Sequence, residues 1–537
     1  MPNDEQLTNI IKAVEELRNK QNEIKKIPKA LFPSFPFADM YIGQYEALQH
    51  MKDKKSTLIS SHTGSGKTAV FVAATIDEPT LIIEPRKFLQ SQSMKLYTNT
   101  TTPSALLFGR REYLCKYAPD TIYGKGNAGN APCLKKARCN NTYYKNECER
   151  YQPKCEQSPC NVFLADDGFH VYPCPDCAYF KAQRAAVDCL KDNGTVIANF
   201  GNFWNLLDKA DNVVIDEADL FFREISTPTI MNATYEMEDI RKMLDSELLD
   251  ITAKMAAANP TEYYRLKNKQ YNVAFLKDNA DLCFAYRKKN WKTKEEKIYV
   301  EINPDSVNVL KDKIFKNKRL IIVTATPTEF NLPNITYSVP QRCGIFYTSQ
   351  GKLTARELKS QPWILDNAAT HFIKPMSDIF NALYGSDKFV VHCGNIGNHA
   401  KRIYYVLGAN NCILHEEGRL MQTIDKFMVS NKRFLLVASA EYGGDFTWCD
   451  CQFVLKVPYA SLDDRMKALE KTMGKAKFKR FYTVDAITRL VQQCGRTGRG
   501  FNSFGCTFIL DSKFIEIYRL YNGAFPEWFK ARMVYGV

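Results

Sequence analysis

One short stretch, TLISSHTGSGKTAVFVAA at residues 57–74, limits the possible folds of this chain more than any other. An apolar run leads into a glycine-rich loop, and a helix-forming run follows the loop. Backbone amides in such a loop bind phosphate groups at the N-terminus of the helix. The stretch therefore predicts the strand–loop–helix unit of a nucleotide-binding α/β domain. Position 61 is Ser where the full pattern G-x-x-x-x-G-K-S/T has Gly.

Single residues of this loop have expected roles. Lys67 would contact the outer phosphates, and Thr68 would hold Mg²⁺. The loop residues predicted to bind the nucleotide are Thr63, Gly64, Ser65, Gly66, Lys67 and Thr68.

A second motif, NVVIDEADLFF at residues 212–222, places two carboxylates directly after an apolar run. Asp216 is suited to hold Mg²⁺, and Glu217 is suited to polarise the attacking water. Alone, these acids could be solvated polar residues at the start of a helix. Downstream of the glycine-rich loop, they predict a site that hydrolyses a nucleoside triphosphate.

Size and charge set further limits. A chain of 537 residues exceeds one hydrophobic core, so we expect about two to four domains. No apolar run approaches the roughly 18 residues of a membrane span, and the N-terminal pattern is an amphipathic helix and not a signal peptide. We therefore expect an intracellular, soluble protein, cytoplasmic in a prokaryotic or virus-infected cell and nuclear in a eukaryotic one.

The net charge of +14 favours a polyanionic partner, with nucleic acid as the first candidate. The alternative is an enzyme that is merely basic.

Cysteines are concentrated in one region, since eight of the 17 fall within 63 residues. Without a secretory signal, disulfides are disfavoured, and metal ligation is the better explanation of the cluster. The eight are Cys115, Cys133, Cys139, Cys148, Cys155, Cys160, Cys174 and Cys177.

Seven further segments follow one another along the chain. They are FPFADMYIGQYEAL (35–48), EPRKFLQSQ (84–92), VIANFGNFW (196–204), LIIVTATPT (320–328), KFVVHCGN (388–395), SAEYGGDF (439–446) and QQCGRTGR (492–499). With these motifs in this order, the chain resembles the superfamily 2 helicases, and within them the iron–sulfur group typified by XPD and DinG. It departs from that group at Tyr442, inserted before a glycine pair, and at the Thr-Gly between Arg496 and Arg499.

The resemblance implies roles for single residues. Gln44 would read the adenine, and Asp445 would contact the nucleotide. Gln492 would face the γ-phosphate, with Arg496 and Arg499 as arginine fingers that neutralise charge during phosphoryl transfer. The residues implied for DNA binding are Arg86, Lys87, Asn199, Thr326, His392 and Tyr442.

The implied fold class is α/β: two RecA-like motor domains with parallel sheets, plus a cysteine-rich metal domain and a helical arch domain inserted in the first. The expected parts are an N-terminal helix (1–30), motor domain 1 (31–105, 180–225 and 317–340), the iron–sulfur cluster domain (106–179), the arch (226–316) and motor domain 2 (341–537).

The family ligates a 4Fe–4S cluster through four thiolates of the cysteine-rich domain. LLFGRREYLC (106–115) and the segment that begins at Cys177 resemble the two ends of that domain, so Cys115 and Cys177 are the firmest expected ligands. The next candidates are Cys133 and Cys160, followed by Cys139, Cys148, Cys155 and Cys174. The spacing of the cysteines in 155–177 also fits a zinc ribbon, so zinc is an alternative or second metal.

Residues 106–155 carry ten Lys or Arg against four acids, interleaved with tyrosines. This pattern suits contact with single-stranded DNA through phosphates and stacked bases. The alternative is a solvated basic loop whose tyrosines pack around the metal.

Overall, the resemblance implies a monomeric ATP-dependent DNA helicase in repair or replication. It would move 5′-to-3′ on single-stranded DNA, and its metal domain would act as a wedge at a forked duplex. The alternative is a nucleic-acid-stimulated ATPase that remodels protein–DNA or RNA complexes without processive unwinding and has a structural metal domain. A metal-binding module without a working motor is disfavoured, because the motor residues are intact.

Overall fold

The computed structural model describes most of the chain outside the cysteine-rich segment. The described residues are 4–20, 26–62, 64–85, 87–98, 100–109, 112–113, 178–226, 228–231, 235, 239–257, 260–289, 293–326, 330–339, 341–347, 357–358, 361–394, 396–416, 419–438, 446, 448–498 and 503–534.

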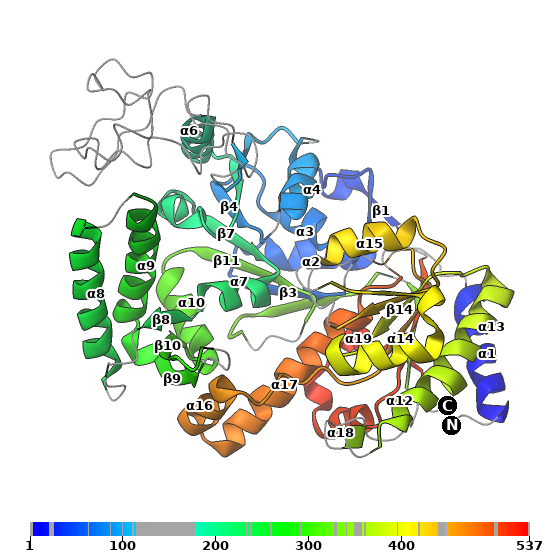
Figure 1. Cartoon of the computed structure of the whole chain (residues 1–537). Coiled ribbons are helices and arrows are strands. Elements are labelled where there is room, and N and C mark those ends of the chain that lie inside the picture. The colour runs from blue at the N-terminus through cyan, green and yellow to red at the C-terminus, as the bar shows by residue number, and fades with distance from the viewer. Residues whose placement is uncertain are drawn as a thin grey trace, which may run out of the picture.

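Seven parallel strands form the first of two large sheets (Figure 1). In spatial order they are β12 (Asn334–Tyr337), β3 (Thr57–Ser61), β11 (Arg319–Thr324), β7 (Asn212–Asp216), β4 (Thr80–Ile83), β6 (Thr195–Ala198) and β5 (Ser104–Leu107). Successive side chains point to opposite faces, so Leu58 and Leu81 join one core cluster while Ile59 and Ile82 join another. Both faces are therefore buried, as expected of a parallel sheet.

Helices cover both faces of this sheet. One face packs against α2 (Ile42–Met51), α3 (Lys67–Ala74) and α4 (Lys87–Tyr97). The other face packs against α6 (Ala178–Lys191) and α7 (Ala218–Ile225). The alternation of strand and helix confirms the predicted RecA-like α/β architecture for this half of the molecule.

The second sheet also contains seven parallel strands. Their spatial order is β15 (Cys412–Leu414), β16 (Phe434–Val437), β14 (Phe389–His392), β17 (Cys451–Val454), β18 (Phe504–Ile509), β13 (Arg342–Tyr347) and β19 (Met533–Val534). The helices over its two faces are α12 (Trp363–Ala368), α13 (Lys374–Tyr384), α14 (Lys401–Leu407), α15 (Leu420–Met428), α17 (Lys475–Cys494), α18 (Lys513–Leu520) and α19 (Glu527–Lys530). This sheet and its helices confirm the second predicted RecA-like unit.

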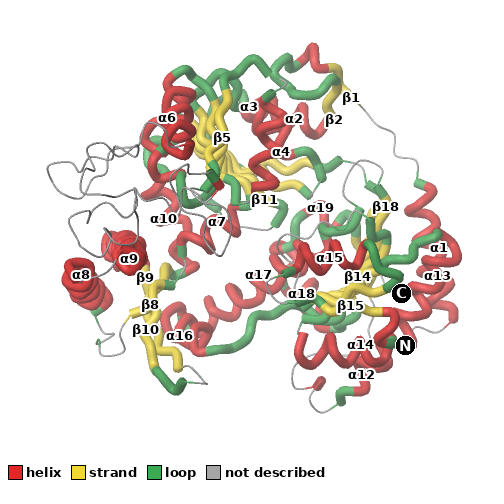
Figure 2. Tube along the Cα trace, turned by 45° about the horizontal axis from the view of Figure 1, so that its top comes forward, coloured by secondary structure: helices red, strands yellow, loops and turns green. Residues whose placement is uncertain are grey.

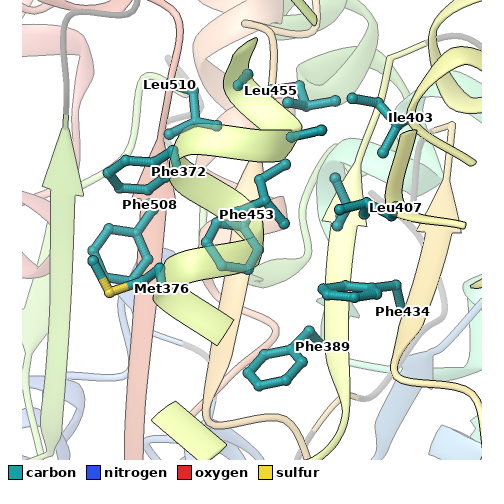
Figure 3. Packing of buried hydrophobic residues seen from close by; sticks show 14 of the residues in the cluster. Phe372, Met376, Phe389, Ile403, Leu407, Phe434, Phe453, Leu455, Phe508 and Leu510 are labelled. Carbon is teal, nitrogen blue, oxygen red and sulfur yellow. The ribbon is translucent and has the colours of Figure 1, made fainter. Parts of the chain in front are cut away.

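Aromatic rings fill one side of this second sheet (Figure 3). Phe372, in the turn between α12 and α13, meets Phe453 and Phe508 of the strands at ring-centroid distances of 6.3 and 5.6 Å. Edge-to-face contacts of this kind add about 0.5–1.5 kcal/mol each beyond the burial of area. The layer holds α12 to α14 against the strands.

The N-terminal helix α1 (Asp4–Asn19) packs on the second sheet, although the first sheet follows it in the chain (Figure 1). Ile10 and Val14 are fully buried there with Phe346 of β13. Gly344 permits the approach, because a Cβ at that position would lie 2.5 Å from Leu17.

A third unit lies between α7 and β11 in the chain. Its helices are α8 (Ile240–Ala257), α9 (Pro260–Asp278) and α10 (Val307–Ile314), and its antiparallel strands run in the order β8 (Thr229–Met231), β10 (Glu296–Ile302), β9 (Cys283–Lys289). The sequence predicted a mainly helical arch domain here; its helices are present, and the three-stranded sheet is an addition that the sequence did not predict. Consecutive charged residues at the end of β9 and the start of β10 hide the alternation of the buried Ile298, Val300 and Ile302.

This third unit rests on the second half of the molecule. Figure 2 shows its strands beside α16 (Asp464–Met473). Phe284 and Tyr286 of β9 pack with Met466 and Leu469 of α16. An insertion in the first domain is therefore attached to the second domain.

Candidate functional site

The glycine-rich loop joins β3 to α3 at the carboxyl end of the first sheet. Gly64 and Gly66 have φ angles of 80° and 76°, a left-handed conformation that favours glycine. Lys67 Nζ donates hydrogen bonds to the carbonyl oxygens of Ser61 and His62, each at 3.0 Å. The loop is thus wrapped around its own lysine, with the N-terminus of α3 directly behind it.

Gln44 supports this loop from α2 and is 4% exposed. Its Oε1 accepts a hydrogen bond from the backbone N–H of Tyr41 at 2.9 Å, and its Nε2 donates to the carbonyl of Ser65 at 2.9 Å. A Cβ on Gly66 would collide with the same carboxamide. The Gln44 carboxamide therefore ties the loop to the start of α2; its predicted contact with adenine stays a prediction.

Two predicted carboxylates follow β7, opposite the loop. Glu217 has φ 52° and ψ 52°, a left-handed conformation that is strained for any residue except glycine. Its backbone N–H donates to Asp216 Oδ1 at 3.0 Å. Burial and the charge of Glu217 raise the pKa of Asp216 to about 7, while Lys67 acts in the opposite direction. Strain and a shifted pKa together mark a functional site.

Glu84 is a third carboxylate that the sequence analysis did not select, although it opens the motif EPRKFLQSQ. It is fully buried after β4 and accepts a hydrogen bond from Ser93 Oγ. Burial, followed by the charge of Asp216, raises its pKa to about 8. Crowded carboxylates beside a single lysine suit a divalent cation with oxygen ligands, such as Mg²⁺.

A complete protein metal cage is absent from the described parts of the chain, where no three His, Cys, Asp or Glu side chains are grouped to hold a metal. This agrees with Mg²⁺ chemistry, because Mg²⁺ usually takes one or two protein ligands and completes its shell with phosphate and water. Thr68, in the first turn of α3, and Asp216 are the predicted ligands. All eight clustered cysteines, Cys115 to Cys177, lie outside the described residues.

The second half of the molecule reaches this site through α17 (Figure 1). Gln492 Nε2 donates to Asp219 Oδ2 at 2.6 Å, and both side chains are buried. Burial and Glu217 raise the pKa of Asp219 to about 6. Gln492 thus binds the last acid of the DEAD segment, whereas the sequence predicted that it would face the γ-phosphate. The sequence analysis missed Asp219, although that segment was the signal for it.

Three further contacts join the halves. Arg223 of α7 forms an ion pair with Asp485 of α17 at 2.7 Å. The indole N–H of Trp528, in α19, donates to the carbonyl of Ala325 at 3.1 Å, and the Trp528 ring lies 6.3 Å from the ring of His62. Arg223, Asp485 and Trp528 carried no signal in the sequence, because each acts through a partner distant in the chain.

Arg496 follows the C-terminus of α17 and is half-buried, and its backbone N–H donates to the carbonyl of Gln493 at 3.2 Å. It is therefore attached to the helix that carries Gln492 to the carboxylates. The other predicted site residues in this part of the chain lie outside the described residues: Arg499, Tyr442 and Asp445.

The residues predicted to contact DNA are placed unequally. Thr326 and His392 are each 1% exposed, so their side chains are not accessible to a strand in this conformation, and their predicted DNA contacts stay predictions. Thr326 shares a 2.9 Å hydrogen bond between hydroxyls with Thr324. Asn199 is half-buried, and its Oδ1 accepts from the backbone N–H of Asn202 at 3.1 Å. Arg86, Thr63 of the phosphate loop and the side chain of Lys87 lie outside the described residues.

The two ends of the cysteine-rich segment meet at the first sheet. Tyr113 and Tyr179 pack edge to face, with ring centroids 5.6 Å apart. Asn202 binds both sides, because its Nδ2 donates to the carbonyl of Phe108 at 2.7 Å and its Oδ1 accepts from the Tyr179 hydroxyl at 3.0 Å. Sequence analysis did not select Asn202, although it lies within the motif VIANFGNFW.

A phosphate-binding loop, strained carboxylates and a helix that approaches them from a second parallel sheet define a P-loop ATPase with two RecA-like domains. Two family models match the chain: DEAD/DEAH box helicase over residues 41–110 and helicase C-terminal domain over residues 399–532.

Solved structures share the fold across nearly all of the chain. Xpd4 of S. tokodaii is 13% identical with a TM-score of 0.50, and the match covers 92% of this chain and 99% of that one. A structure described as XPD helicase is 13% identical with a TM-score of 0.51, over 88% of this chain and 95% of that one. No curated protein matches the sequence. The family models indicate helicase domains of the ATP-dependent hydrolase class, and the solved XPD structures show that the chain shares their fold.

None of the described helices is long and apolar enough to cross a membrane.

Proposed function

We propose that this protein is an ATP-driven translocase on single-stranded DNA that unwinds forked duplexes, moving 5′-to-3′ as a monomer in DNA repair or replication. The observation that supports it most is the contact of Gln492 with Asp219, which joins the helix before Arg496 to the carboxylates beside the phosphate loop. A site completed by two domains converts the nucleotide state into relative domain movement, and such movement is what a motor requires.

Each residue has a chemical role in the proposed cycle. Lys67 leaves its two carbonyl partners and binds the outer phosphates. Glu217 orients water for attack at the γ-phosphorus, and Arg496 neutralises charge that develops during transfer. Mg²⁺, held by Thr68 and Asp216, would supply positive charge at the phosphates. Loss of the γ-phosphate then weakens the contact between the domains and lets them separate.

The cysteine-rich domain is proposed to hold a 4Fe–4S cluster and to act as the wedge at the fork. The packing of Tyr113 on Tyr179 supports this, because these residues stand two positions from Cys115 and Cys177 and bring both ends of the segment together. Four thiolates would ligate such a cluster. Zinc would give the same domain a purely structural role.

Metal analysis of anaerobically purified protein tests this assignment. About four iron atoms per chain with a visible absorption band are expected for one 4Fe–4S cluster. Zinc without iron would overturn the cluster and leave the motor assignment unaffected.

A strand-displacement assay tests the motor. The substrates are forked duplexes that differ in two ways: the loading strand is DNA or RNA, and either the 5′ or the 3′ tail is single-stranded. Each substrate is mixed with enzyme and ATP. Displacement of the DNA fork with the 5′ tail, abolished in Lys67→Ala, is expected. ATP hydrolysis without displacement, or displacement on RNA only, would contradict the proposal and favour a remodelling ATPase.

A further inference from the structure

A polar side chain sits inside the apolar second sheet. Gln452 of β17 is 0% exposed, and its neighbours Cys451 and Phe453 belong to the core. Its Nε2 donates to Thr507 Oγ1 at 2.8 Å, to the carbonyl of Gln493 at 3.0 Å and, at 3.4 Å, to the carbonyl of Cys494. A buried carboxamide is costly unless it is fully hydrogen-bonded, so these partners explain how this fold accommodates Gln452.

The carbonyls that Gln452 binds end helix α17. The last carbonyls of a helix have no partner within the helix and need donors from elsewhere. The carbonyl of Gln493 accepts from Gln452 and also from the backbone N–H of Arg496, at 3.2 Å. Gln452 therefore shares an acceptor with the residue proposed as the arginine finger, and it fixes the turn that carries this arginine.

His392 fixes the orientation of the Gln452 carboxamide. Its Nε2 lies 3.1 Å from Gln452 Oε1. Because Gln452 Nε2 points to three acceptors, Oε1 must accept, and the neutral His392 ring must donate from Nε2. Burial, in particular, lowers the pKa of His392 to about 4, which keeps the ring neutral. His392 Nδ1 has no hydrogen-bond partner among the described residues.

We propose that Gln452 and His392 are positioning residues for Arg496: they hold the C-terminus of α17 so that the arginine meets the γ-phosphate when the domains close. Neither residue touches the nucleotide. The inference rests on the proposed role of Arg496 as an arginine finger, and it reassigns His392 from DNA contact to support of the ATPase site.

Single-turnover hydrolysis of bound ATP tests the proposal in the full-length protein. In Gln452→Leu, which keeps the volume but removes the hydrogen bonds, hydrolysis is expected to fall about 10- to 100-fold, the effect of misplacing a reacting group by about 1 Å. Affinity for ATP should stay within about threefold, because the phosphate loop lies in the other domain. His392→Leu should show the same split, and His392→Gln, whose Nε2 can replace the donor, should restore hydrolysis.

Ser386→Ala is the matched control, because Ser386 Oγ donates to Asp450 Oδ2 at 2.7 Å, beside the strands that carry His392 and Gln452. It removes a buried hydrogen bond without touching α17, so hydrolysis should be unchanged. The proposal would be overturned if Ser386→Ala slowed ATP hydrolysis as much as Gln452→Leu does. It would also be overturned if His392→Leu impaired hydrolysis and His392→Gln did not restore it.

The outcome also separates this inference from the proposed function. Wild-type hydrolysis in Gln452→Leu and His392→Leu, with an inactive Arg496→Ala, would refute the positioning role alone. An Arg496→Ala variant that hydrolyses ATP normally would refute the proposed site itself. If Gln452→Leu does not fold, the comparison of His392→Leu with His392→Gln decides.

Discussion

At the scale of single residues, Gly66 of the phosphate loop has little room for a side chain. Its φ of 76° disfavours any side chain, and a Cβ would also collide with Gln44. Gly66→Ala should weaken ATP binding by at least about tenfold, since strain of roughly 1–2 kcal/mol adds to the collision. Titration with a fluorescent ATP analogue measures the change.

Gly385→Ala separates strain from collision. Gly385, at the end of α13, has a similar φ of 68° but nothing within 4 Å of the added Cβ. It should lower stability by about 1 kcal/mol and leave ATP affinity unchanged. Equal ATP affinity in Gly66→Ala and wild type would show that the loop does not need its close contact with Gln44.

Glu84 makes stability depend on pH. Its pKa rises from an ordinary 4.5 to about 8, so the folded protein binds this proton more tightly than the unfolded chain does. The contribution to stability is full below about pH 4.5 and is lost as the pH rises toward 8. The melting temperature is measured in EDTA without nucleotide between about pH 5 and pH 8, which is roughly the interval over which the pKa of Glu84 is shifted. Over this interval Glu84→Gln should lose less thermal stability than wild type. Parallel pH profiles would contradict the crowding of carboxylates.

The sequence predicted residues of this site where a short motif carries the chemistry. Lys67 opens the helix after its loop, and Asp216 and Glu217 stand at the end of β7, so local pattern brings them to the candidate site. Glu84 and Asp219 were missed because their importance comes from burial and from partners far along the chain.

At the scale of elements, the missed strands β9 and β10 show a limit of hydrophobic pattern. Their buried residues alternate correctly, but Lys, Arg and Glu stand in consecutive runs where the two strands meet their turn, and the helices beside them dominate the composition. The sheet exists because it packs on α8, α9 and α16, and those partners lie apart in the chain.

One ion pair should dominate the contact of this sheet with α16. Glu301 of β10 is 2% exposed and accepts from Arg465 Nε and Nη2 at 2.7 to 2.9 Å. Glu301→Ala leaves a half-buried guanidinium without its carboxylate and should cost about 2–3 kcal/mol in denaturant unfolding. The exposed pair of Arg287 with Glu296 lies in the same sheet, so Glu296→Ala is the control and should cost less than about 0.5 kcal/mol. Equal costs would argue against this contact.

At the scale of the whole molecule, the N-terminal helix is part of the C-terminal core. Ile10→Ala should therefore destabilise the second motor domain by about 2–4 kcal/mol through a cavity beside Phe346. Glu16→Ala, on the exposed face of α1, should change stability by less than about 0.5 kcal/mol. Hydrogen exchange in β13 reports the effect; unchanged protection in Ile10→Ala would mean that α1 does not support this sheet.

The resemblance carried by the ordered motifs implied the two-domain architecture. It could not predict which side chains join the domains. Trp528 with Ala325, and Arg223 with Asp485, meet only after both sheets have formed and docked.

The most direct test of the account is ATP hydrolysis by Arg496→Ala with nucleotide binding measured in parallel. If the second domain completes the site, the variant should bind ATP within about threefold of wild type and hydrolyse it about 10³-fold more slowly in the presence of single-stranded DNA. Hydrolysis at the wild-type rate would show that the first domain acts alone, and it would contradict a motor whose two domains share one catalytic site.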